Sequence, residues 1–259
     1  MTSPLARIVA ARGQQRQGAP VGLCVHTTGG GIVRRAVEAQ RDPMAHATEF
    51  YSHAGVYPHY LIGWDGAIVS LASDDRMAAA AKWEPWERAA YHSGITWPTM
   101  WEHDETLHHV PVGFYAWWHD RWVPRGFPSP WHIYRWSTGL LDPHGSTPNR
   151  PWIHVEMLDH KPSFTDAQVD ALARLFVDRA RAHQWLDPAN VEPDALPTPW
   201  LLSHADLSPC RRSQAHPSPT REAGSYPFDP LPGQLDWRAL GLRIVAVARG
   251  VTEQPHRVG

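Results

Sequence analysis

A short alternating segment near the start of the chain is the feature that most constrains its fold. Residues 21–27 alternate between the two faces of an extended chain, with Val21, Leu23 and Val25 on one face and Cys24 and His26 on the other. Three glycines at positions 29–31 end this predicted strand. A helical stretch follows, which is interrupted at Pro43 and ends near His53.

Two further strands are predicted by a hairpin signal. Residues 59–62 and 67–71 are apolar segments that flank Asp65-Gly66, a dipeptide typical of tight β-hairpin turns. Residues 151–158 predict another strand, and one face of it carries Trp152, His154 and Glu156.

The clearest helix runs from Thr165 to about Gln184. Thr165 and Gln168 have the spacing of a capping box, and apolar residues then recur with helical periodicity. Residues 197–203 predict one more strand, which delivers His204 at its end. Strands that alternate with helices predict an α/β fold, with a mixed central β-sheet of about five or six strands flanked by helices.

We expect the whole chain, residues 1–259, to form a single domain with its core at about 20–94 and 151–241. Residues 95–150 differ from that core, because seven tryptophans lie between Trp97 and Trp136 without a regular period. This segment is expected to be a Trp-rich insertion that folds onto the core. Its aromatic residues either pack against the core or form a wall for a carbohydrate or peptide substrate.

Composition excludes several classes of protein. A balance of 24 Lys and Arg against 26 Asp and Glu gives a net charge of −2, which argues against a nucleic-acid-binding surface. No apolar stretch is long enough for a membrane helix, and the N-terminus lacks the apolar region of a signal peptide. Two cysteines, Cys24 and Cys210, cannot form a disulfide framework, although one bridge between them is conceivable.

Two histidines are the first candidates for chemistry. His26 and His204 each end a predicted strand, the position at which α/β sheets usually place their sites. Histidine is also the commonest protein metal ligand, and the chain contains 17 of them. Considered alone, each of these residues is more simply an ordinary histidine than a metal ligand. The surrounding motifs therefore decide between the two interpretations.

Taken together, six motifs resemble the zinc-dependent N-acetylmuramoyl-L-alanine amidases of type 2, which share a fold with peptidoglycan recognition proteins. The motifs occur in the order of that family: Val25-His26-Thr27-Thr28, the hairpin from His59 to Gly66, Tyr91-His92-Ser93-Gly94, Ile153-His154-Val155-Glu156, Ser203-His204-Ala205-Asp206, and the stretch from Asp229 to Trp237. Each motif is weak evidence by itself, but six in order are strong evidence. The resemblance implies an amidase-type fold and a zinc cofactor.

The resemblance further implies that His26 and His204 bind the zinc ion, but the third ligand departs from the family pattern. Asp229 lies in the best-matching motif and is the preferred candidate, although it requires a long insertion in the preceding loop. His216 and Cys210 are the alternatives, and all three residue types can bind zinc. A site that has lost its metal is a fourth interpretation.

Glu156 matches the position of the catalytic acid and base of the family, so it is expected to move the proton between water and the leaving amine. Arg212 aligns best with the basic residue that stabilises the oxyanion, and Arg221 is the reserve candidate. His59 is expected to be a buried histidine that donates to the backbone, whereas His92 is a candidate for substrate contact.

The function implied is zinc-dependent hydrolysis of the amide between N-acetylmuramic acid and L-alanine in peptidoglycan. The alternatives are a non-catalytic recognition module and a zinc hydrolase of the same fold that acts on another amide. We expect a monomer that binds peptidoglycan or muropeptides, with neither nucleic acid nor membrane insertion. Without a signal peptide, a phage lysin, an exported toxin and a cytoplasmic recycling enzyme all fit, and release to the cell wall would use a non-classical route.

Overall fold

The computed structural model describes residues 2–9, 13–16, 18–28, 30–80, 152–160, 162–198, 200–204, 230 and 233–251. The expected insertion at 95–150 lies outside these ranges, as does its proposed aromatic wall.

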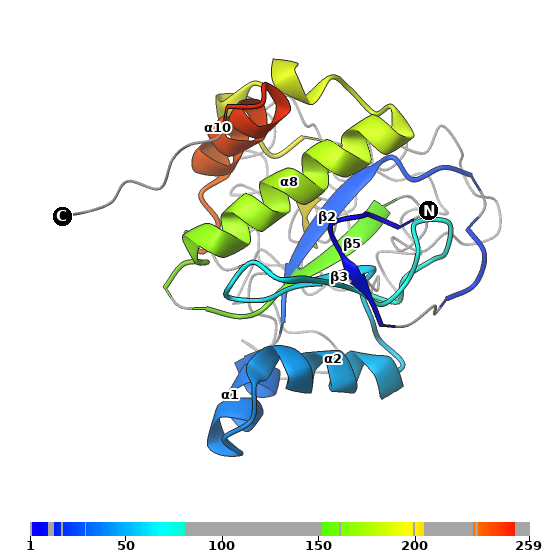
Figure 1. Cartoon of the computed structure of the whole chain (residues 1–259), viewed down its shortest axis with the longest axis vertical. Helices are drawn as coiled ribbons and strands as arrows, with labels where there is room; N and C mark the ends of the chain where they lie inside the picture. Colours follow the sequence, from blue (N-terminus) through cyan, green and yellow to red (C-terminus); the bar gives the residue numbers. More distant parts are fainter. Residues whose placement is uncertain are drawn as a thin grey trace, which may run out of the picture.

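Six strands form one mixed sheet (Figure 1): β1 (Arg7–Ile8), β2 (Gly22–Thr27), β3 (Tyr60–Ile62), β4 (Ile68–Ser70), β5 (Trp152–Met157) and β6 (Leu201–Ser203). Their order across the sheet is β1-β4-β3-β5-β2-β6. Strands β3, β5, β2 and β6 run parallel to one another, whereas β4 pairs antiparallel with β3. The carboxyl ends of the four parallel strands therefore meet at one edge of the sheet, where α/β proteins place their sites.

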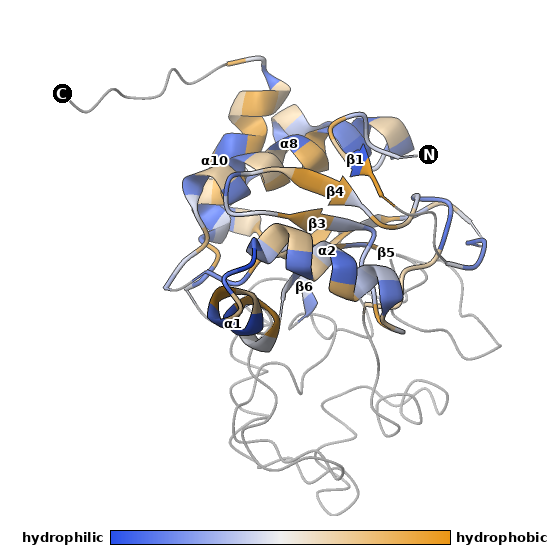
Figure 2. Cartoon of the chain, turned by 60° about the horizontal axis from the view of Figure 1, so that its bottom comes forward, coloured by the Kyte–Doolittle hydropathy of each residue, from blue (hydrophilic) through white to orange (hydrophobic). Residues whose placement is uncertain are grey.

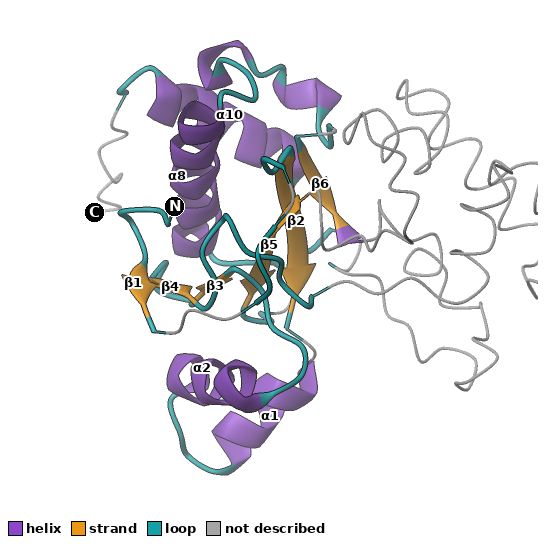
Figure 3. Ribbon diagram, turned by 90° about the vertical axis from the view of Figure 1, so that its right-hand side faces the viewer, coloured by secondary structure: helices purple, strands orange, loops and turns teal. Residues whose placement is uncertain are grey.

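Helices lie on both sides of the sheet (Figure 3): α1 (Gly30–Glu38), α2 (Pro43–His53), α8 (Asp166–His183) and α10 (Trp237–Ala248). Two short 3-10 helices, Pro188–Asn190 and Pro193–Ala195, follow α8. In Figure 2 these α-helices carry both hydrophilic and hydrophobic residues, as expected of helices that pack one side on a core. No helix in the described part of the chain is long and apolar enough to cross a membrane.

The main core lies between the sheet and α8. Leu23 and Val25 of β2 contribute to it together with Leu172 and Phe176 of α8. A smaller cluster forms on the opposite face, where Leu61 of β3 is buried with residues of α1 and α2. Burial on one face of each strand follows from the alternation of side chains along an extended chain.

Local signals fix where the helices begin. The side chain of Thr165 accepts a hydrogen bond from the Gln168 N–H (3.1 Å), and the Gln168 side chain accepts one from the Thr165 N–H (3.0 Å), which completes the predicted capping box. Asp42 caps α2, whose first residue is Pro43, and Asp236 caps α10.

The α/β class, the mixed sheet and the predicted strands and helices are confirmed. Boundaries differ by a few residues, and the last predicted strand, 197–203, shortens to Leu201–Ser203. The edge strand β1, helix α10 and the two short 3-10 helices were not predicted. β1 contains only two residues, which is too short for a sequence period to appear.

Candidate functional site

The face of the sheet that points away from α8 carries a set of polar side chains near the carboxyl ends of the parallel strands. Because side chains alternate, the strand that places Leu23 and Val25 in the main core places Cys24 and His26 on the other face. Parallel pairing sets Cys24 opposite His154 and His26 opposite Glu156. We call this set the histidine face: Cys24, His26, His154, Glu156 and His204.

The histidine face has a deeper and a shallower row. Cys24 and His154 are fully buried, and they lie two residues before His26 and Glu156 along their strands. His26 and His204 are 1% and 2% exposed, and Glu156 is 7% exposed. Exposure therefore rises toward the strand ends, with the carboxylate as the most accessible member.

His26 is the centre of this arrangement. Its ring centroid lies 4.6 Å from that of His204 and 5.0 Å from that of His154. On the deeper side, Nε2 of His26 lies 2.8 Å from Nδ1 of His154 and 3.4 Å from Sγ of Cys24. His26 therefore contacts His154 of β5, His204 directly after β6, and the thiol of Cys24 in its own strand.

The donor chemistry of the face fits a zinc ion. Imidazole nitrogen, thiolate sulfur and carboxylate oxygen are the ligands that zinc prefers. Within the described ranges, Cys24, His26 and His154 form a group whose ligand atoms all lie within 4.8 Å of one another, and all three are buried. His26 and His204 provide the second close pair of imidazoles.

His59 lies beside the histidine face on β3's amino-terminal side and is held by the backbone. Its Nδ1 accepts a hydrogen bond from the His154 N–H (2.9 Å), and its Nε2 donates to the Arg76 carbonyl oxygen (2.8 Å). Burial, together with the nearby charge of Arg16, lowers the pKa of His59 to about 3. His59 is therefore a neutral structural histidine, and the expectation that it donates to the backbone is confirmed.

The predicted site residues divide into two groups. The structure brings together His26, His204 and Glu156 on the histidine face. The remaining candidates lie outside the described residues: His92, Cys210, Arg212, His216, Arg221 and Asp229. The conceivable bridge from Cys24 to Cys210 falls in the same category.

The contact between the side chains of His154 and His26 was not predicted from the sequence. The alternation of residues 151–158 already placed His154 on the face of Glu156, and the alternation of 21–27 placed Cys24 on the face of His26. The missing information was the register, since only the pairing of β2 with β5 sets Cys24 opposite His154.

Solved structures of AmpD and AmiA resemble the chain at low similarity. A selenomethionine derivative of AmpD is 17% identical, with 96% of each chain covered and a TM-score of 0.43. Staphylococcus aureus hydrolase AmiA, in complex with its ligand, is 13% identical over 97% of this chain and 88% of its own, with a TM-score of 0.41. Citrobacter freundii AmpD in solution is 18% identical over 97% and 95%, with a TM-score of 0.39. No curated protein sequence matches the chain significantly.

Family membership comes from the sequence profile of Amidase_2, described as N-acetylmuramoyl-L-alanine amidase, which matches residues 16–220. This range contains His26, Glu156 and His204, and it spans most of the chain. The protein therefore belongs to the Amidase_2 family of N-acetylmuramoyl-L-alanine amidases, which supports an amidase activity on peptidoglycan.

Proposed function

We propose that this protein is a zinc-dependent enzyme that hydrolyses the amide between the lactyl group of N-acetylmuramic acid and L-alanine. In this proposal His26 and His204 bind the zinc ion with a third ligand, for which Asp229 is the first candidate. The observation that carries the proposal is the position of Glu156, directly opposite His26 in the register of β2 and β5. A carboxylate there stands next to the paired imidazoles of His26 and His204.

The third ligand needs its own test. The family match ends at residue 220, so it includes Cys210 and His216 and stops before Asp229. Zinc content should therefore be measured separately for Asp229→Ala, His216→Ala and Cys210→Ala. The proposal expects Asp229→Ala to lose zinc, and loss in one of the other variants would assign the ligand to that residue instead.

Each residue has one task in the proposed reaction. When bound, zinc supplies Lewis acidity that polarises the scissile carbonyl and makes water acidic enough to act as a nucleophile near neutral pH. Glu156 accepts the proton of the attacking water and then donates it to the leaving amine of L-alanine. Arg212 offsets the negative charge that develops on the carbonyl oxygen. The pairing of β2 with β5 fixes the relative positions of His26, His154 and Glu156 on the histidine face.

Mass spectrometry of purified muropeptides after incubation with the protein tests this function. A product with a newly formed L-alanine amine is expected, and it should disappear with a zinc chelator and return when zinc is added. Glu156→Ala, which keeps both proposed histidine ligands, should bind zinc but give no product.

Two other results would replace the proposal. Muropeptides that bind but stay intact, in the presence of bound zinc, would indicate a non-catalytic recognition module. Cleavage of a different amide, found by profiling synthetic peptides and acylated amino acids, would indicate a hydrolase of this family with another substrate.

A further inference from the structure

The deeper row of the histidine face has no task in the proposed reaction. Cys24 and His154 are both completely buried, directly behind His26. Burying a polar side chain costs free energy unless it makes a specific interaction. One such interaction of His154 is the contact of 2.8 Å between its Nδ1 and His26 Nε2.

We infer that His154 is a positioning residue for the metal site: its Nδ1 accepts the Nε2–H of His26 and so assigns the other ring nitrogen, Nδ1, to the metal. The inference rests on the proposed function, because it concerns how His26 is prepared to bind zinc. Two nitrogens 2.8 Å apart share one proton, so one of them must donate. If His26 bound zinc through Nε2, this hydrogen bond would have to break.

The contact distance also argues against direct ligation by both rings. Two nitrogens bound to one tetrahedral zinc ion at the usual bond length lie about 3.3 Å apart. The observed 2.8 Å is instead a normal hydrogen-bond length. Cys24, with Sγ 3.4 Å from the same nitrogen, closes the space behind His26 without replacing that bond.

His154 contacts His59 on its other side. Its backbone N–H donates to Nδ1 of His59 (2.9 Å), and the two rings are nearly parallel, with an interplanar angle of 12°. His59 is tied to the Arg76 carbonyl oxygen, and the Arg16 guanidinium lies 2.9 Å from the same nitrogen. A partner anchored in this way fixes both the tautomer and the orientation of His26, as outer-shell partners of zinc-binding histidines do.

Two variants separate the hydrogen bond from the volume of the side chain. His154→Asn places an amide oxygen near the position of Nδ1 and can still accept the proton, whereas His154→Leu fills similar space without an acceptor. Zinc affinity is measured on metal-free protein by competition with a chromophoric chelator. His154→Leu should bind zinc about 10- to 100-fold more weakly, and His154→Asn should remain within a few-fold of the wild type.

A second measurement reads the proton directly. Imidazole ¹⁵N–¹H correlation spectra of the zinc-loaded wild type should show His26 protonated at Nε2, with that proton lost from the spectrum in His154→Leu. This readout does not depend on activity, and circular dichroism checks that each variant is folded. A His26 protonated at Nδ1, or equal zinc affinity in both variants, would overturn the inference.

Cys24→Ala serves as the control for direct ligation. Cobalt-substituted wild type and cobalt-substituted Cys24→Ala should show the same absorption in the region of sulfur-to-cobalt bands, and Cys24→Ala should bind zinc nearly as well as the wild type. A strong band that disappears in Cys24→Ala would make Cys24 a ligand and overturn the inference. A wild type that binds no zinc overturns the proposed function as well, whereas a zinc-binding, active wild type with an unaffected His154→Leu overturns this inference alone.

Discussion

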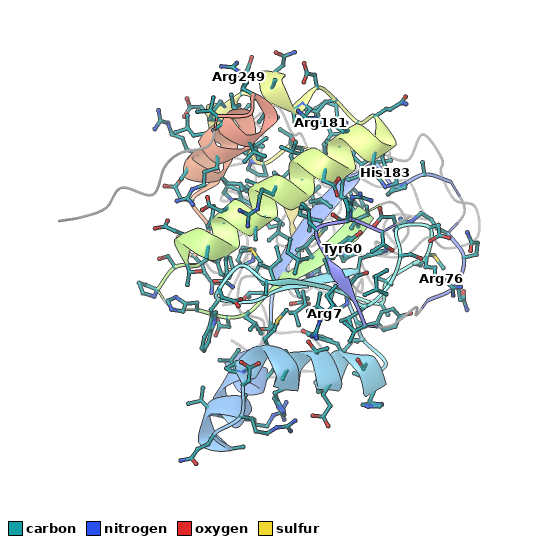
Figure 4. All side chains as sticks on the ribbon, in the orientation of Figure 1. Arg7, Tyr60, Arg76, Arg181, His183 and Arg249 are labelled. Atoms are coloured by element: carbon teal, nitrogen blue, oxygen red, sulfur yellow. The ribbon has the colours of Figure 1, made fainter. Side chains whose placement is uncertain are left out.

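Two buried polar clusters of this protein differ in how their charges are arranged. One surrounds Asp74, whose carboxylate accepts hydrogen bonds from Tyr60 Oη (2.7 Å), Arg179 Nη1 (2.5 Å) and His183 Nε2 (2.9 Å). Figure 4 shows Tyr60 on β3 below α8, and His183 near the end of α8. We call these four residues the Asp74 cluster.

In the Asp74 cluster a buried carboxylate is surrounded by hydrogen-bond donors, one of which is a cation. Burial alone would raise the pKa of Asp74, but the hydrogen bonds from His183 and Tyr60 and the charge of Arg179 together lower it below its ordinary value. The histidine face instead consists of lone-pair donors only: imidazoles, a thiol and a carboxylate. The Asp74 cluster already contains its cation, the guanidinium of Arg179, whereas the histidine face has the composition of a site that binds a cation.

Removal of a proposed metal ligand should change activity more than any other substitution considered. His204→Ala removes one proposed ligand and should lower amidase activity by about 10⁴-fold, since a catalytic metal supplies several kcal/mol. Bound zinc, measured by elemental analysis, should fall in parallel. The matched control is His183→Ala, which removes a histidine of the Asp74 cluster and should keep the zinc content of the wild type. Stoichiometric zinc in His204→Ala would contradict the assignment.

The second effect concerns proton transfer. Glu156→Gln keeps the size of the side chain but cannot accept a proton, so kcat should fall by about 100-fold or more. Zinc content should stay unchanged, which separates this variant from the loss of a ligand. Glu49→Gln, at an exposed position of α2, is the control and should retain full activity. An active Glu156→Gln enzyme would exclude Glu156 as the acid and base.

The third effect concerns stability. Asp74→Asn leaves the buried Arg179 without its charged partner and should lower the free energy of unfolding by about 3–5 kcal/mol. Denaturant titration measures this change, and the zinc affinity of the folded protein should remain that of the wild type. Asp166→Asn removes an acidic residue that is 91% exposed and pairs with Arg243, so it should change stability only slightly. Equal effects of the two variants would show that burial does not distinguish these ion pairs.

The smallest effect is a pH dependence from His59. The unfolded chain protonates this histidine below its ordinary pKa, whereas the folded protein keeps it neutral down to about 3. Stability from this group is therefore present above about pH 6.5 and is lost as pH falls, by about 2 kcal/mol between pH 7 and pH 5. Denaturant titrations at both pH values should show this loss in the wild type and a smaller one in His59→Gln. An equal loss of stability in the wild type and in His59→Gln would show that this pH dependence does not come from His59.

Much of the framework was predictable because local signals specified it. The capping box of Thr165 and Gln168 and the Asp65-Gly66 turn act within a few residues, so their effect can be read from neighbouring positions. Helix α10 was not predicted, although the side chain of Asp236 caps its amino end.

The class of the fold, the two faces of each predicted strand and the family that His26, Glu156 and His204 indicate could all be predicted from the sequence. Those properties follow from periodicity and motifs, which are local. The position of Cys24 opposite His154 and the contact of His154 with the ring of His26 could be seen only in the folded sheet. The reason is physical: register between strands far apart in the chain is set by packing of the whole sheet, and a shift of one residue would turn the histidine face into the core.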